Sequence, residues 1–96
     1  MKNKIIHMAE IFKMLSNDIR LCILVNLCIN GEIKVTELQE CSKASQSLVS
    51  QQLAKLRIAN IISADKRGNE VYYSIKDNEV KEIINNTILK DMDCKK

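Results

Sequence analysis

The stretch from Ser45 to Ile58, S-Q-S-L-V-S-Q-Q-L-A-K-L-R-I, decides the fold. Its apolar residues Val49, Leu53 and Leu56 recur at i, i+4 and i+7, which places them on one face of a helix. Ser45 suits the N-cap position, because its hydroxyl can accept a hydrogen bond from a first-turn N–H group. The outward side chains are short hydroxyls and amides with one cation, a set able to probe base edges and phosphates in a major groove. They are Gln46, Ser47, Ser50, Gln51 and Lys55.

A shorter helical pattern precedes this helix. Residues 35–41, V-T-E-L-Q-E-C, place Leu38 inward and Thr36 where it can cap the helix. Residues 42–44 then form a tight connection into the second helix. Two helices joined by so few residues are typical of a helix-turn-helix.

Two runs rich in strand-forming residues follow the helix-turn-helix. Residues 61–66, I-I-S-A-D-K, and 70–75, E-V-Y-Y-S-I, flank a Gly-Asn tip and predict a hairpin, which residues 32–34 could join as a third strand. A hairpin in this place is the wing of a winged helix. Lys66 and Arg67 on its shoulder are then placed to meet the DNA backbone beside the groove.

The run from Val35 to Ile75 resembles the winged-helix core of the ArsR/SmtB family of bacterial transcriptional regulators. The resemblance rests on S-Q-S-L-V-S-Q-Q-L-A-K-L-R and on the wing return G-N-E-V-Y-Y-S-I, and residues 14–21, M-L-S-N-D-I-R-L, resemble the family's junction between the first two helices. It implies a mainly α fold with a small β-hairpin wing, in the order helix, helix, strand, helix, helix, two strands, helix. It also implies a homodimer joined through the first and last helices, and an effector that alters DNA affinity.

The composition fits one small globular domain spanning residues 1–96. The net charge of +3 is weak support for a nucleic-acid partner, and its placement around the wing and the recognition helix counts for more. No apolar run approaches the ~18 residues of a spanning helix, and a signal-peptide pattern is lacking, so we expect a cytoplasmic protein without a membrane partner. With no phosphate-cradling glycine loop and no Cys/His or paired-carboxylate pattern, we expect neither an enzyme nor a cofactor.

The two terminal helices are expected at residues 3–16 and 77–90. The first has an apolar surface broad enough to pack on its own domain and on a partner. The last carries an apolar stripe that most economically packs against the first helix and its symmetry mate. A two-fold dimer would set two recognition helices about one DNA turn apart, so the operator should be an inverted repeat. His7, the single histidine, is expected to be a solvated helix residue. The apolar stripe of the last helix consists of Val80, Ile83, Ile84, Thr87 and Ile88.

The four cysteines are the candidates for sensing. The family's zinc-type site on the last helix is absent, because residues 77–90 contain no histidine, and its C-x-C soft-metal site retains Cys41 alone. We therefore predict no metal site, with Cys41 as the remaining metal candidate. Another family variant senses oxidants or reactive sulfur through cysteines on the second and last helices, which here are Cys22 or Cys28 together with Cys94. The alternative is that Cys22 and Cys28 are apolar core residues and Cys94 a tail thiol.

The sequence thus predicts a homodimeric DNA-binding transcriptional regulator, most simply a repressor on an inverted-repeat operator, with release by thiol oxidation or persulfidation as one mode of response. A metal-thiolate-responsive repressor, a constitutive regulator and an anti-silencer are compatible with the same helix-turn-helix. An alternative of another class is a protein–protein interaction module that uses the winged-helix surface for a partner other than double-stranded DNA.

Overall fold

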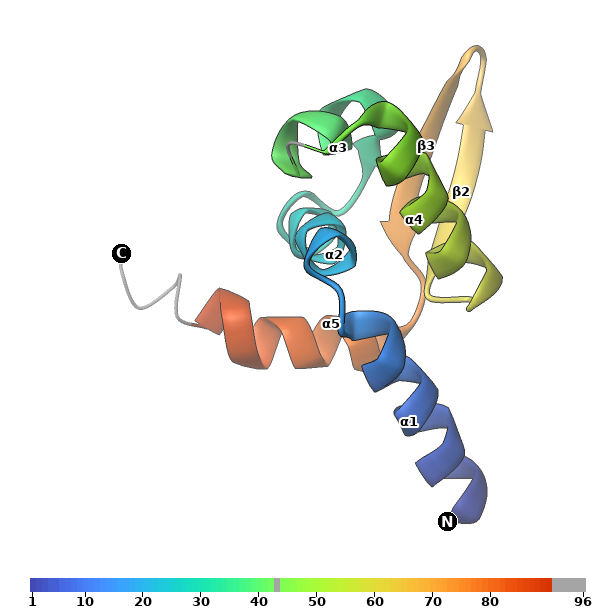
Figure 1. Cartoon of the computed structure of the whole chain (residues 1–96), viewed down its shortest axis with the longest axis vertical. Coiled ribbons are helices and arrows are strands. Elements are labelled where there is room, and N and C mark those ends of the chain that lie inside the picture. Colours follow the sequence, from blue (N-terminus) through green and yellow to red (C-terminus); the bar gives the residue numbers. More distant parts are fainter. Residues whose placement is uncertain (43, 91–96) are drawn as a thin grey trace.

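The computed structural model describes residues 1–42 and 44–90. Within the first range, it describes only the backbone of residues 39–42. Its element order confirms the predicted mainly α, winged helix-turn-helix fold (Figure 1). None of the described helices is both long and apolar enough to cross a lipid bilayer. The elements are α1 (Lys2–Leu15), α2 (Asp18–Asn30), β1 (Ile33–Lys34), α3 (Val35–Ser42), α4 (Gln46–Ile58), β2 (Ile62–Arg67), β3 (Glu70–Ile75), α5 (Asn78–Ile84) and the π-helix η1 (Asn85–Leu89).

Side-chain caps fix where three of the helices begin. The side chains of Asn17, Ser45 and Asp77 each accept hydrogen bonds from backbone N–H groups two or three residues later, before α2, α4 and α5 respectively. These bonds satisfy donors that have no partner inside the helix. At the other end of α2, Gly31 adopts a φ of 80°, which a side chain would disfavour. Of these boundaries, the sequence analysis predicted the cap at Ser45.

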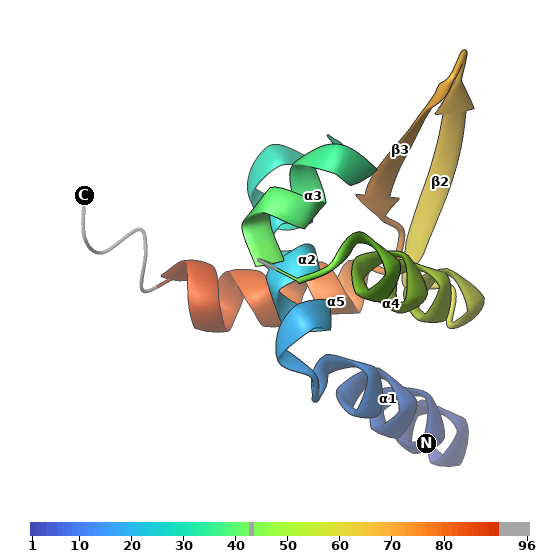
Figure 2. The same cartoon turned by 45° about the horizontal axis from the view of Figure 1, so that its top comes forward.

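The sheet is antiparallel, with the strand order β1-β3-β2, so the predicted third strand is confirmed. Arg67 pairs with Glu70, which leaves Gly68 and Asn69 as a two-residue turn. Gly68 has a φ of 63°, as the first central residue of a type II′ hairpin turn requires. The tip of the β2–β3 hairpin stands clear of the helices in Figures 1 and 2.

The core is aliphatic and is centred on α2. This helix contacts α1, α3, α4, α5 and β3, and Figures 1 and 2 show it between the helix-turn-helix and α5. Burying the apolar faces of all these helices together supplies the main driving force for folding. The largest fully buried side chains are Ile23, Leu24, Leu27, Leu38, Val49, Leu53, Leu56, Ile61, Val80 and Ile84.

The last helix departs from the prediction in its final turn. We expected one amphipathic helix over residues 77–90, and the chain is helical there, but Asn85–Leu89 form a π-helix in place of a regular α-helical turn. The packing of the stripe against a second copy stays a prediction. Thr87 is exposed and Ile88 is 37% exposed. Because η1 is a π-helix, in which hydrogen bonds run from i to i+5, the packed position moves to Leu89, five residues after the buried Ile84.

Candidate nucleic-acid interface

Helix α4 has one face in the core and the opposite face in solvent. Val49, Leu53 and Leu56 are at most 2% exposed, as the heptad-like spacing predicted. The helix therefore cannot rotate without exposing three core side chains. All five predicted contact residues on α4 are exposed, and the helix brings them together on its outer side: they are Gln46, Ser47, Ser50, Gln51 and Lys55.

One polar residue of α4 lies on the buried face. Gln52 is 6% exposed, and its Oε1 accepts a hydrogen bond of 2.6 Å from Nη1 of Arg20. Nε of Arg20 donates at 2.7 Å to the backbone carbonyl of Met14, at the end of α1. A single guanidinium thus ties α4 to the junction of α1 and α2. The sequence analysis missed this link, although the position of Gln52 three residues after Val49 signals that it shares the apolar face.

The predicted wing residues have different surroundings. Arg67 donates two hydrogen bonds to the carboxylate of Glu32, of 2.8 and 2.7 Å, and one of 2.9 Å to Asp65. Its guanidinium lies 4.6 Å from the ring centroid of Tyr72, and the carboxylate bonds raise the pKa of Arg67. Lys66 is exposed and has no hydrogen bond or ion pair to any described residue. Lys66 is therefore the more accessible cation of the two.

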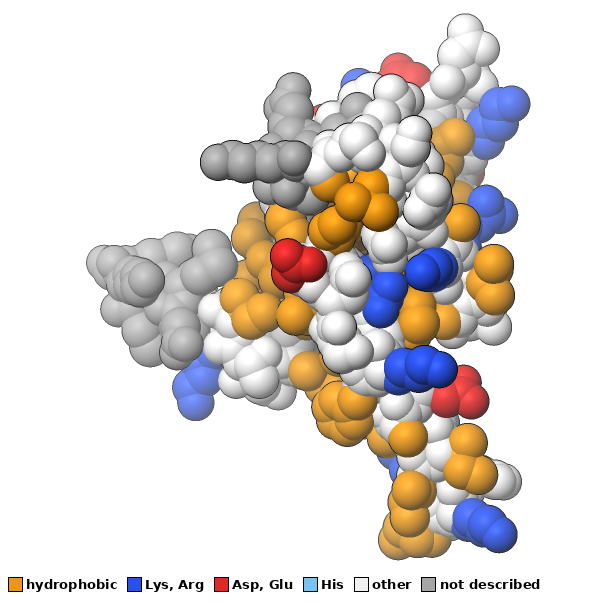
Figure 3. Space-filling view, viewed as in Figure 1, with side chains coloured by type: hydrophobic (Ala, Val, Ile, Leu, Met, Phe, Trp, Pro, Cys, Tyr) orange, Lys and Arg blue, Asp and Glu red, His pale blue; other side chains and the backbone are white. Residues whose placement is uncertain are grey.

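Basic side chains are spread over the side of the molecule formed by α4 and the wing. Figure 3 shows Lys and Arg side chains along this side, with few acidic side chains between them. A surface of this kind favours a polyanion, because cations near the surface replace the counterions of the phosphates.

The structure places two of the predicted sensing cysteines on α2. Cys22 is disulfide-bonded, and its Sγ also accepts a hydrogen bond of 3.8 Å from Nδ2 of Asn26. Cys28 is a free cysteine and half-buried, and burial raises the pKa of its thiol. Cys94 and the side chain of Cys41 lie outside the described residues. The structure therefore leaves the predicted pairing with Cys94 untested.

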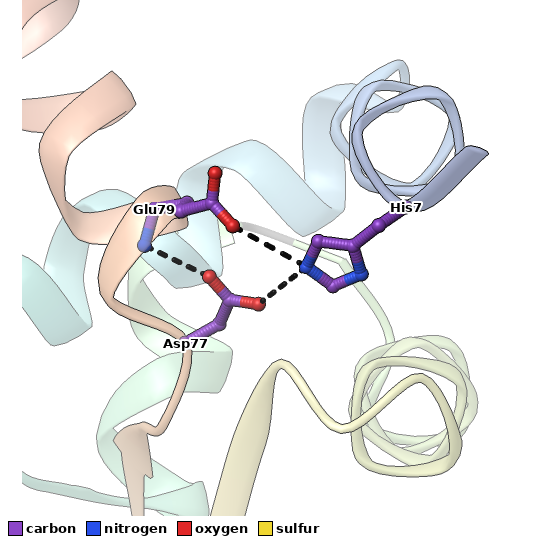
Figure 4. A group of neighbouring side chains, drawn as sticks. All are labelled: His7, Asp77 and Glu79. Atoms are coloured by element: carbon purple, nitrogen blue, oxygen red, sulfur yellow. Dashed lines mark hydrogen bonds and ion pairs between the residues drawn. The ribbon is translucent and has the colours of Figure 1, made fainter. Parts of the chain in front are cut away.

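His7 is an exposed residue of α1, as the sequence analysis expected, and it also has carboxylate neighbours. Its ring lies beside the carboxylates of Asp77 and Glu79, at the point where α1 meets the start of α5 (Figure 4). No local pattern could reveal this cluster, because about 70 residues separate its two halves.

Comparisons with known proteins agree with this geometry. The family model for bacterial regulatory proteins of the arsR family matches residues 17–64. An uncharacterized HTH-type transcriptional regulator of Methanocaldococcus jannaschii is 41% identical over 79% of this chain and 85% of its own length. The transcriptional repressor PagR of Bacillus anthracis is 36% identical over 79% of this chain and 76% of its own length. The structure of HlyU from Vibrio cholerae superposes with a TM-score of 0.85 at 33% identity, covering 98% of this chain and 99% of HlyU.

These relatives are named as regulators of transcription rather than enzymes, as the sequence analysis expected. Proteins of this family bind DNA, and both the matched segment and the fold include the complete helix-turn-helix. The chain is a DNA-binding transcriptional regulator and belongs to the arsR family of bacterial regulatory proteins.

Proposed function

We propose that the protein is a homodimeric repressor that binds an inverted-repeat operator in double-stranded DNA. The observation that carries this proposal is the polar face of α4, exposed along its length and held outward by the buried opposite face. Gln51 and Lys55 lie on this face with three other short polar residues. Side chains of these types can hydrogen-bond base edges and phosphates without blocking entry into the groove.

The exposed apolar side chains of α1 support a homodimer. Ile5, Ile6 and Phe12 are 62%, 51% and 55% exposed, on a helix whose inner face already buries Ile11 and Leu15. Figure 3 shows hydrophobic side chains gathered along this helix. Large apolar groups clustered on one exposed helix favour a protein partner, and a second copy supplies the same surface by symmetry. Ile88, displaced from the core at η1, extends the proposed interface to the last helix.

In such a dimer two α4 helices would enter successive major grooves about one helical turn apart, which a palindromic operator matches. The wing would lie beside the groove, where Lys66 can reach the phosphates. Arg67 is engaged by Glu32 and Asp65, so its main contribution would be to hold the wing in position.

The proposal is tested with purified protein and a labelled DNA fragment from upstream of its own gene, titrated at several salt concentrations. We expect binding that weakens steeply with salt, because phosphate contacts release counterions. Gln51→Ala combined with Lys55→Ala should abolish specific binding. Lys76→Ala removes an exposed lysine outside the predicted set of DNA contacts and should leave specific binding unchanged. Absence of salt-dependent binding to any upstream fragment would refute the DNA-binding role and favour a protein–protein module.

For the effector, we propose a thiol switch in which Cys22 pairs with Cys94. It is supported by the disulfide state of Cys22 and by the family resemblance, which implies one sensing cysteine on the second helix and one on the last. Oxidant or persulfide treatment should release the DNA, and reductant should restore binding. Cys22→Ser and Cys94→Ser should each remove the response, while the control Cys28→Ser keeps it. A response that persists in both variants would end this proposal, and release by a soft metal through Cys41 would then be examined.

A further inference from the structure

We propose that His7, Asp77 and Glu79 bind a divalent first-row transition-metal ion, with zinc as the best-fitting member, and that the ion fastens α1 to the start of α5. This site is separate from the DNA-binding surface and from the cysteines. It combines one residue of α1 with two residues at the N-terminal end of α5 (Figure 4).

The spacing of the three donor atoms fits a metal ion better than it fits direct hydrogen bonds. Nε2 of His7 lies 3.6 Å from Oδ2 of Asp77 and 3.4 Å from Oε1 of Glu79, and the three ligand atoms lie within 4.8 Å of one another. Direct hydrogen bonds would bring such atoms to about 2.7–3.2 Å. Around a tetrahedral ion with bonds of about 2.1 Å, neighbouring ligand atoms are separated by about 3.4 Å. Each carboxylate oxygen therefore already stands at about the distance from the His7 nitrogen that coordination requires.

Asp77 is held in place by a role that leaves one oxygen available. Its Oδ1 caps α5 by accepting hydrogen bonds from the backbone N–H groups of Glu79 and Val80, at 2.8 and 3.2 Å. Its Oδ2 faces His7. The capping bonds orient the carboxylate as an outer-shell hydrogen bond orients a metal ligand. The side chains of Asp77 and Glu79 are 16% and 32% exposed and that of His7 is 52% exposed, so water can complete the coordination.

The local charge also favours a cation. Two carboxylates converge on a ring that is neutral when it acts as a ligand, and Lys4 pairs with Glu79 through the oxygen that does not face His7. Lys4 therefore lies at the edge of the cluster, on the far oxygen of Glu79, and leaves the oxygen that faces His7 available. An imidazole nitrogen with two carboxylates suits zinc, cobalt or nickel, whereas magnesium and calcium prefer oxygen donors throughout.

An ion at this position would act on the packing of the terminal helices. α1 carries the exposed apolar side chains described above, and the ion would fix its direction relative to α5. The first-order effect is on stability, because ligands drawn from the two ends of the chain come together in the folded state alone.

The test is a titration of the full-length reduced protein with Co²⁺ as a spectroscopic probe and with Zn²⁺ by calorimetry. We expect binding with d–d absorption but no sulfur-to-metal charge-transfer band, and an increase in the unfolding temperature with Zn²⁺. His7→Gln and Glu79→Gln should each weaken binding at least about tenfold. Glu82→Gln is the matched control, because it neutralises an exposed carboxylate of the same helix outside the cluster.

Circular dichroism without metal confirms that each variant is folded before its affinity is compared. Loss of binding in His7→Gln and Glu79→Gln, with Glu82→Gln unchanged, would establish the site. No binding by the native chain would overturn the proposal, and so would affinity retained in His7→Gln. A charge-transfer band would assign the metal to the cysteines and equally overturn it.

Discussion

Replacing Arg20 by methionine should destabilise the protein by about 2–3 kcal/mol. The substitution keeps a long side chain but removes the hydrogen bonds to Gln52 and to the carbonyl of Met14, of 2.6 and 2.7 Å. A hydrogen bond with a charged partner contributes roughly 1.5–3 kcal/mol. The full sum of the two is not expected, because Arg20 is half-buried and water can replace part of what is lost. Gln52 is 6% exposed, so its orphaned oxygen accounts for most of the cost.

The assay is urea unfolding followed by circular dichroism at one protein concentration, since the stability of the proposed dimer would depend on concentration. For a domain of this size, 2–3 kcal/mol corresponds to a fall in Tm of about 10–20 °C. Gln52→Met removes the acceptor and its desolvation cost together, so it should destabilise less. The double variant should reveal a coupling energy of about 1–2 kcal/mol between the two residues. Arg57→Met is the control, because Arg57 is an exposed arginine on α4. If Arg20→Met cost no more than Arg57→Met, or the coupling were zero, the assigned link would be refuted.

On the wing, Lys66→Ala should lower the salt dependence of DNA binding. The slope of log K against log salt should decrease in magnitude by about 2 for the proposed dimer if each Lys66 contacts one phosphate. The matched variant Lys76→Ala should leave that slope unchanged. Gly31→Ala should cost about 1–3 kcal/mol in the same urea assay, since its φ of 80° strains any side chain although nothing lies within 4 Å of the added Cβ. An unchanged midpoint would contradict this cause. For Cys28, burial raises the pKa above its ordinary value of 9.0 and Lys81 partly offsets this, so the alkylation rate of a variant retaining Cys28 alone should reach half-maximum above pH 9.0. As the pH rises, the Cys28 thiol loses its proton in the unfolded state before it does so in the folded state. The stability that this thiol contributes is therefore complete below pH 9.0 and is lost as the pH rises through the folded-state pKa. A half-maximal alkylation rate at or below pH 9.0 would exclude the burial effect.

Local pattern was sufficient for the helix-turn-helix and the wing. The spacing of Val49, Leu53 and Leu56 predicted which face of α4 is buried, and Ser45 predicted where the helix begins. These features could be predicted because each depends on residues within one or two turns of each other. The tip at Gly68 was predictable for the same reason.

The remaining features depend on pairs that are distant in sequence. Arg20 and Gln52 are 32 residues apart, and Arg67 reaches Glu32 across 35 residues. The periodicity of the sequence does not predict such contacts, because they form only when helices and strands pack against one another. The π-helical turn that brings Leu89 inward was missed for another reason: a stripe analysis assumes 3.6 residues per turn throughout. A site on α4 could therefore be predicted from sequence, whereas the contacts that position it could not.

The bidentate bond between Arg67 and Glu32 has a consequence for the entropy of recognition. An isolated two-stranded ribbon samples many orientations, and a ligand that selects one of them must oppose that freedom. Here the shoulder of the hairpin is fastened to the turn between α2 and β1, and the ring of Tyr72 supports the same guanidinium. Much of the ribbon's motion is therefore lost when the chain folds. A ligand that contacts Lys66 therefore binds a hairpin that is already ordered. Removing the Glu32 carboxylate would free the hairpin and add an entropic cost to each binding event.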